Sequence, residues 1–266
     1  MPSFRDDSIV AIIQARMGSS RLPGKVMKEI GGTPMLFHVV LRVRRSQYIG
    51  RVIVATTYEP GDDPVADYCR QQGIPCYRGH PQDVLDRYYQ AAKRFHAQTV
   101  VRLTADCPLI DPREIDRTVA AFLESGVDFA ANRLPAPWQR TTPIGMDTEV
   151  VSLEALTSAW KNAQADYERE HVMPYMYDQE GRFEILLVQH DPDWGQFRLT
   201  VDTPEDLELV RCIVDHFNGS NEISLIEIIR FLEAHPEVHS INANTAHKSF
   251  TDVDERYTGV LGRIDS

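Results

Sequence analysis

Three basic residues follow the first apolar run of the chain, in the stretch QARMGSSRLPGKV at residues 14–26. Arg16, Arg21 and Lys25 come directly after residues 9–13, an apolar run typical of a buried β-strand. Arginine can bind phosphate oxygens through two nitrogens, and glycine lets a backbone approach a ligand closely. The stretch therefore predicts a polyphosphate site at the end of a strand, with a solvated basic turn as the alternative.

The stretch differs from a P-loop in two ways. Five residues instead of four separate Gly18 from Gly24, and Val26 follows Lys25 where a P-loop has Ser or Thr. The extra residue, next to a proline, disturbs the nest of backbone N–H groups, and valine cannot bind magnesium. The dinucleotide fingerprint GxGxxG is also missing from this turn. Any metal ligands must therefore come from another part of the chain.

The composition predicts an ordinary soluble globular protein. The 266 residues are 42% hydrophobic and 25% charged. A net charge of -11 argues against binding to a nucleic-acid polymer, so a basic site must be local. No apolar run approaches the roughly 20 residues that span a bilayer, and we expect a cytoplasmic protein without a membrane partner. The four cysteines lack CxxC spacing, which predicts neither a zinc site nor a disulfide framework.

Short β-branched runs alternate with helical patterns through the first half of the chain. This alternation is typical of a parallel sheet covered by helices. We expect strands at residues 9–13, 51–57, 74–77, 99–104 and 127–131, and helices from about residue 33 and at 63–72, 81–97 and 112–124.

The alternation stops at residues 133–147, where prolines favour extended loops. Helices at 153–162 and 168–177 and strands near 183–188 and 197–201 follow. Thr203 and Asp206 predict a capped helix start, and another helix is expected at 224–234. We therefore predict a single domain over residues 1–266, with an inserted segment at 133–196 and a polar tail at 236–266.

The order of motifs resembles a known enzyme family. Residues 14–25 are similar to the signature of the sugar-acid cytidylyltransferases, which include the CMP-ketodeoxyoctulosonate and CMP-acylneuraminate synthetases. The closest likeness is to the SpsF-like branch of spore coat polysaccharide biosynthesis. The resemblance continues through residues 78–79, 83–89, 103–110, 145–150, 170–172 with 174–175, and 200–206. It covers roughly residues 8 to 232.

The resemblance implies both an architecture and a reaction. The architecture is a three-layer, nucleotide-diphosphosugar-transferase-like (GT-A type) fold with a mixed, mainly parallel sheet and an inserted acceptor and dimerisation segment. The reaction transfers CMP from CTP to an acidic sugar, or a related hydroxy acid, and releases pyrophosphate. The implied cofactor is Mg2+, the implied assembly is a homodimer, and the implied process is surface polysaccharide biosynthesis.

The resemblance also assigns roles to individual residues. Arg16, Lys25, Asp106 and Asp202 are implied to be catalytic, and the two aspartates to hold Mg2+. Taken alone, each aspartate could equally be a turn or helix-cap residue. The implied nucleotide-binding residues are Ala11, Ile13, Gln14, Ala15, Arg16, Arg21, Lys25, Asp86, Arg87 and Thr104.

Two assignments keep a structural alternative. Asp86 also fits the first turn of a helix, where the dipole favours acids. Thr104 stands where some relatives have a glutamine. The implied acceptor-binding residues are Asp147, Glu149, Glu170 and His171, with His171 as a helix cap in the alternative reading. Arg133 and Arg140 could bind an acceptor carboxylate or be solvated loop charges.

Two other functions remain open from the sequence. A glycosyltransferase of the related fold would need a DxD motif at a strand end. The two DxD sequences lie instead in an expected loop, at residues 191–193, and in the tail, at 252–254. A catalytically silent nucleotide-binding protein is the second alternative, and the presence of both Asp106 and Asp202 argues against it.

Overall fold

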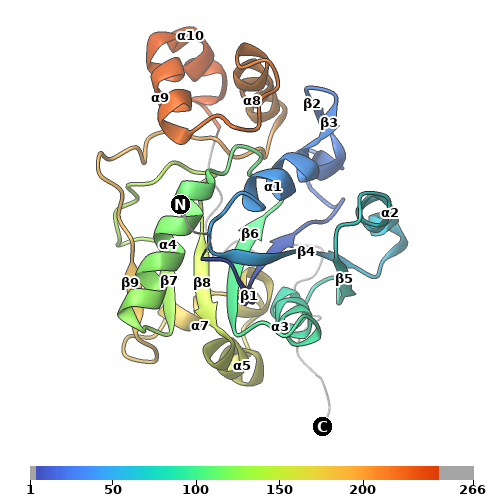
Figure 1. Ribbon diagram of the computed structural model, residues 1–266, viewed down its shortest axis with the longest axis vertical. Coiled ribbons are helices and arrows are strands. Elements are labelled where there is room, and N and C mark those ends of the chain that lie inside the picture. The colour runs from blue at the N-terminus through green and yellow to red at the C-terminus, as the bar shows by residue number, and fades with distance from the viewer. Residues whose placement is uncertain (1–3, 246–266) are drawn as a thin grey trace.

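A single mixed sheet organises the computed structural model, which describes residues 4–245. Within these residues seven strands are ordered β5-β4-β1-β6-β8-β7-β9 (Figure 1). Strands β5, β4, β1 and β6 run parallel, β8 is antiparallel to β6 and β7, and β9 is parallel to β7. The strands are β1 (Asp6–Gln14), β4 (Ile49–Thr57), β5 (Cys76–Gly79), β6 (Thr99–Thr104), β7 (Phe129–Ala131), β8 (Glu149–Ser152) and β9 (Ile185–Leu187).

Helices cover both faces of this sheet. One face packs against α1 (Met35–Val43), α2 (Asp63–Gln71) and α4 (Pro112–Ser125). The other packs against α3 (Val84–Arg94), α5 (Leu153–Asn162) and α7 (Pro174–Tyr177), with α6 (Asp166–His171) against α3. The α/β class with a mainly parallel sheet, predicted from the alternation, is confirmed.

A third cluster of buried apolar residues lies beside the sheet. It is built by α8 (Pro204–His216) and α9 (Leu225–Ala234), with α10 (Pro236–His239) beside them. The short elements are η1 (Lys25–Met27), β2 (Glu29–Ile30), β3 (Thr33–Pro34), η2 (Pro60–Asp62) and η3 (Ser240–Asn242).

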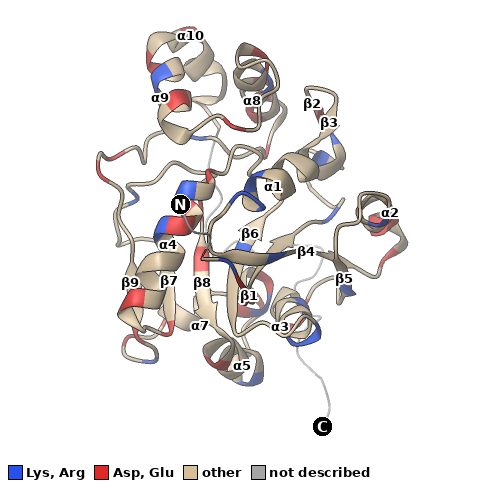
Figure 2. Cartoon of the chain, in the orientation of Figure 1, with Lys and Arg blue, Asp and Glu red and all other residues tan. Residues whose placement is uncertain are grey.

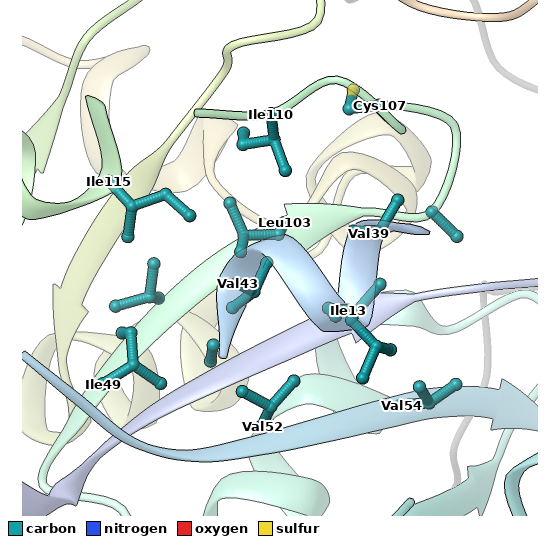
Figure 3. Packing of buried hydrophobic residues seen from close by; sticks show 14 of the residues in the cluster. Ile13, Val39, Val43, Ile49, Val52, Val54, Leu103, Cys107, Ile110 and Ile115 are labelled. Carbon is teal, nitrogen blue, oxygen red and sulfur yellow. The ribbon is translucent and has the colours of Figure 1, made fainter. Parts of the chain in front are cut away.

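Residues 9–13 of strand β1 are buried on both faces of the sheet, which explains their unbroken apolar sequence. Ile13 faces Val39 and Val43 of α1, beside Val54 of β4 (Figure 3). Ile12 points to the opposite face and belongs to the cluster with α3 and α5. A strand between two helical layers needs apolar residues on both sides. The polar residues that follow β1 therefore emerge at the carboxyl edge of the sheet.

Positions of Lys and Arg and of Asp and Glu are spread over the helices and loops, and charged positions also occur in several strands of the sheet (Figure 2). No helix within residues 4–245 is both long enough and apolar enough to cross a membrane.

Several expected elements are confirmed at their bounds. The strand at 99–104 and the helix at 153–162 coincide with β6 and α5. Thr203 caps α8, and Asp206 completes the predicted capping box. The helix expected at 224–234 is α9, capped by Ser224.

Other expectations were wrong. The helix expected at 168–177 is divided, because Val172 adopts a φ of 73° and Pro174 then begins α7. Proline disfavours a helical conformation at the residue before it and lacks the N–H that a continuing helix needs. The strand expected at 197–201 is only an isolated bridge between Ile144 and Arg198. Strand β8 was missed.

The inserted segment is described throughout, and the tail is described as far as residue 245. Residues 133–196 supply β8, the helices α5 to α7 and β9. The tail begins with α10 and η3. Residues 246–266, with the second DxD sequence at 252–254, lie outside the described residues.

Replacing Gly145 by alanine should destabilise the fold strongly. Gly145 has a φ of 105°, and a Cβ there would lie 2.6 Å from backbone atoms of Leu199 and Thr200. We expect the free energy of unfolding to fall by about 3 kcal/mol, measured by urea denaturation.

The matched control is Gly219→Ala. Gly219 has a φ of 75° with nothing within 4 Å of the added Cβ, so it carries the backbone strain without the clash. A loss of about 1 kcal/mol is expected there. Equal losses for the two variants would show that the close approach at Gly145 has no energetic importance.

Candidate functional site

The basic loop after β1 folds back on itself. The Met17 carbonyl accepts a hydrogen bond of 2.9 Å from the Gly24 N–H, and the Leu22 carbonyl accepts one of 3.2 Å from the Lys25 N–H. Gly24 has a φ of 69°, a conformation that glycine adopts without steric cost. This closure turns Lys25 inward, and its side chain is buried.

The Lys25 ammonium binds three oxygen atoms. Nζ donates to Asp106 Oδ2 at 2.7 Å, to Asp202 Oδ1 at 2.8 Å and to the Val201 carbonyl at 2.9 Å. An ammonium has three N–H donors, so all of them are used. Burial lowers the pKa of Lys25, but the two carboxylates outweigh it and hold that pKa above its ordinary value.

Asp202 is also held by two arginines. Its Oδ2 lies 3.1 Å from Arg21 Nη2 and 2.8 Å from Arg198 Nη2. Burial alone would raise the pKa of Asp202, but Lys25 and the arginines lower it to about 2. Arg198 also binds both oxygens of Asp206, at 2.8 and 2.9 Å. This network fixes the start of α8 beside the basic loop.

Asp106 follows β6 and is fixed from both sides. Thr104 Oγ1 donates to Asp106 Oδ1 at 2.5 Å, while Lys25 occupies Oδ2. The Val201 N–H donates to the Asp106 carbonyl at 2.8 Å, which joins the segment before α8 to the end of β6. The structure therefore brings Arg21, Lys25, Asp106 and Asp202 into one cluster.

The cluster fits a magnesium ion in its chemistry. Three hard oxygens, from Asp106, Val201 and Asp202, already converge on one cation, the Lys25 ammonium. Carboxylate and carbonyl oxygens are the ligands that Mg2+ prefers. Residues 4–245 contain no group of three or more His, Cys, Asp or Glu that could hold a metal. A metal at this cluster would thus complete its shell with a ligand or water.

Arg16 lies on another side of the loop, near α6. Its Nη2 is 3.9 Å from Glu170 Oε1. His171 follows Glu170 and is the last residue of α6. The structure therefore brings the first arginine of the loop to Glu170, one of the residues expected to bind the acceptor.

The expected backbone contacts are largely occupied by the sheet. Ala11, Ile13 and Ala15 are buried, the Ala15 N–H donates to the Ala55 carbonyl, and the Gln14 carbonyl accepts from Ala105. In the Gln14 side chain, Oε1 is a buried atom without a hydrogen-bond partner.

Asp86 and Arg87 lie inside the layer of helices. Asp86 accepts hydrogen bonds from Trp160 Nε1 at 2.8 Å and from Gln90 Nε2 at 3.1 Å. Arg87 is fully buried, and only its Nη1 is paired, with the His80 carbonyl at 2.9 Å. Burial lowers the pKa of Arg87 to about 10.

Two of the expected acceptor residues form ion pairs with arginines. Asp147 binds Arg140 at 2.6 and 3.1 Å and lies 3.8 Å from Arg133. Glu149 is buried in β8 and pairs with Arg102 of β6 across the antiparallel ladder. Arg133 and Arg140 are thus partners of Asp147 rather than solvated charges.

Arg198 was missed by the sequence reading. It anchors both Asp202 and Asp206, although it lies in a segment without regular secondary structure. Arg198 lies four residues before Asp202, a spacing typical of an ion pair on a helix, but the surrounding sequence has no helical pattern. Nothing else in the sequence indicated a role for Arg198.

The sequence is similar to those of known proteins. A family model described as Cytidylyltransferase matches residues 10–234. The spore coat polysaccharide biosynthesis protein SpsF of Bacillus subtilis is 30% identical over 238 residues, covering 87% of this chain and 96% of SpsF. A 3-deoxy-manno-octulosonate cytidylyltransferase of Nitratidesulfovibrio vulgaris is 39% identical over 125 residues, covering 45% of this chain and 48% of that enzyme.

A solved structure has the same fold. The structure of a cytidylyltransferase from Leptospira borgpetersenii superposes with a TM-score of 0.82 and 34% sequence identity. The match covers 91% of this chain and 99% of that chain.

The Arg102–Glu149 pair should be essential for stability. Glu149→Leu removes one partner of a buried ion pair and leaves Arg102 as an uncompensated charge. We expect a loss of about 3 kcal/mol or more in the free energy of unfolding.

The double variant Arg102→Met with Glu149→Leu is the matched control. It removes both charges, so it should recover most of that stability in urea denaturation. A double variant no more stable than Glu149→Leu alone would contradict the interpretation.

Proposed function

Because this chain belongs to the cytidylyltransferase family, we propose that it transfers CMP from CTP to an acidic sugar or a related hydroxy acid and releases pyrophosphate. The family makes it a nucleotidyltransferase enzyme. One observation carries the proposal: two carboxylates, Asp106 and Asp202, meet two cations of the basic loop, Arg21 and Lys25, at the carboxyl edge of the sheet. Open α/β sheets bind their ligands at this edge.

The cations of the loop bind the triphosphate. Arg21 and Lys25 form ion pairs with Asp202 and Asp106. They therefore lie where the phosphate groups of a metal-bound nucleotide would be. Phosphoryl transfer gains mainly from positioning and from electrostatic stabilisation of developing charge. Arg16 would stabilise charge on the α-phosphate and on the leaving pyrophosphate, and Lys25 would do the same once its N–H groups are released from Asp106, Val201 and Asp202. Mg2+ held by Asp106 and Asp202 would neutralise the remaining phosphate charge.

The base lies over the ends of β1 and β6. Gln14 and Thr104 are paired in the register of these two strands and mark that edge. The unpaired Oε1 of Gln14 suits the exocyclic amino group of cytosine, because a buried acceptor gains most from a donor. Uracil has a carbonyl at that position. Arg87, buried with two unpaired nitrogens, adds positive charge behind the base.

The acceptor lies beside Arg16 and α6. Glu170 and His171 can accept hydrogen bonds from acceptor hydroxyl groups, and Asp147 with its arginine partners borders the same inserted segment. The acidic sugar is supported by the likeness to 3-deoxy-manno-octulosonate cytidylyltransferase, and a role in surface polysaccharide synthesis by the likeness to SpsF. A GT-A type arrangement, a homodimer built through residues 133–196 and a cytoplasmic location complete the proposal.

Asp106→Asn should abolish the reaction without unfolding the protein. The amide keeps the shape of the side chain but cannot neutralise a metal, so we expect pyrophosphate release from CTP to fall by at least about 100-fold. The assay supplies CTP, Mg2+ and a panel of acidic sugars and simpler hydroxy acids. The melting temperature checks the fold.

The control for this variant is Asp67→Asn, which removes an exposed carboxylate on α2 paired with Arg70. Its turnover should equal that of the unaltered protein. Retained turnover in Asp106→Asn would rule out the proposed role of Asp106.

Lys25→Met should strengthen metal binding in the absence of nucleotide. Removal of the ammonium leaves Asp106 and Asp202 facing each other without their shared cation, so their repulsion favours a divalent ion. We expect the Kd for Mn2+ alone, followed by electron paramagnetic resonance, to fall by about tenfold.

Lys93→Met on α3 removes an exposed lysine and should leave the Mn2+ affinity unchanged. If Lys25→Met also left it unchanged, the ammonium would not occupy the place that a metal takes.

A further inference from the structure

Asp62 is a buried carboxylate outside the cluster described above. It ends η2 in the connection between β4 and α2, and only 6% of its surface is exposed. Its Oδ1 accepts a hydrogen bond of 2.6 Å from the Met17 N–H, and its Oδ2 accepts one from Thr57 Oγ1. A buried carboxylate is costly unless its oxygens are hydrogen-bonded. The Asp62 carboxylate is therefore stabilised in part by a hydrogen bond from one backbone amide of the basic loop.

This bond anchors the loop at Met17. The Met17 N–H is held by Asp62, and the Met17 carbonyl is held by Gly24. Two residues earlier, the Ala15 N–H is held by the Ala55 carbonyl of β4. Arg16 thus lies between two anchored amides, both fixed by β4 or the segment that follows it. These two hydrogen bonds fix the backbone on either side of Arg16 and therefore set the direction of its side chain.

We propose that Asp62 is a positioning residue for the basic loop, acting through the Met17 amide to aim Arg16 at the phosphates. The assignment of phosphates to this loop rests on the proposed function. The sign of the charge supports a positioning role: a carboxylate beside a phosphate site repels the ligand, so Asp62 contributes through the groups that it holds in place rather than by binding the ligand. Hydrogen bonds from an N–H to a charged carboxylate are among the stronger ones in proteins.

A second role for Asp62 has to be separated from this one. Burial lowers the pKa of the nearby Arg87, and the negative charge of Asp62 opposes that lowering. Asp62→Asn separates the two roles, because its amide oxygen still accepts from Met17 and its amide nitrogen can donate to Thr57, while the charge is lost. Asp62→Ala removes both the charge and the hydrogen bonds.

The first measurement is hydrogen exchange at the Met17 amide in the full chain without ligand. Asp62→Ala should exchange there at least about tenfold faster than the unaltered protein, and Asp62→Asn should stay within about threefold. This readout does not depend on which nucleotide the enzyme uses. Unchanged exchange in Asp62→Ala would overturn the anchoring role.

The second measurement is ligand affinity and turnover. Asp62→Ala should raise the Kd for inorganic tripolyphosphate and the KM for CTP by about tenfold, with a smaller change in kcat, whereas Asp62→Asn should retain or improve both affinities. Asp63→Asn, an exposed neighbour paired with Arg78, controls for loss of charge alone. If Asp62→Asn and Asp62→Ala lost the same affinity, the role of Asp62 would be to neutralise Arg87 and not to position the loop.

The two hypotheses fail in different ways. If the Met17 exchange follows the prediction but CTP does not turn over, the proposed function fails and the anchor stands. If CTP turns over and Asp62→Ala keeps its affinity for tripolyphosphate, the positioning proposal fails and the function stands.

Discussion

The Lys25 ammonium is the interaction on which the site depends. It joins three parts of the chain: the loop after β1, the end of β6 and the segment before α8. None of these parts could place its charges alone, because Asp106 and Asp202 would repel each other without a cation between them. A buried ion pair is retained only when its hydrogen bonds are complete, and here every N–H of the ammonium has an acceptor. The cluster is therefore both a structural junction and the point where a phosphate ligand would find its cations.

The sheet explains why these parts meet. The chain moves from β1 to β4 and β5 on one side and returns to β6 on the other side of β1. The chain leaves β1 toward one edge of the sheet and leaves β6 toward the other edge. A crevice for ligands forms where the strand order reverses in this way. Gln14 and Thr104 are neighbours at this point. Asp106 follows two residues after Thr104, and its carboxylate contacts Lys25 of the basic loop.

Much of this arrangement could be predicted from the sequence, because local patterns encode it. The apolar run of β1, the strand at 99–104 and the capping box at Thr203 each depend on residues close in the chain. The basic residues of the loop could be identified for the same reason, because they lie close together in the sequence. The meeting of Asp106 and Asp202 was expected only through the family resemblance.

The remaining features depend on contacts between distant residues. The family resemblance implied that Glu149 binds the acceptor. Only the register of β8 with β6 shows that Arg102 lies opposite it. Asp62 carried no pattern at all, since its partner is a backbone amide 45 positions away. The division of the helix after His171 depends on the left-handed conformation of Val172, which a valine seldom adopts.

The measurement that tests the account most directly is the melting temperature in the presence of Mg2+ with CTP, UTP or GTP. A ligand that binds only the native state raises the melting temperature, and more so when it binds more tightly. The account predicts that CTP gives a much larger rise than either of the other nucleotides. Equal rises for all three would contradict the assignment of this edge of the sheet to cytidine.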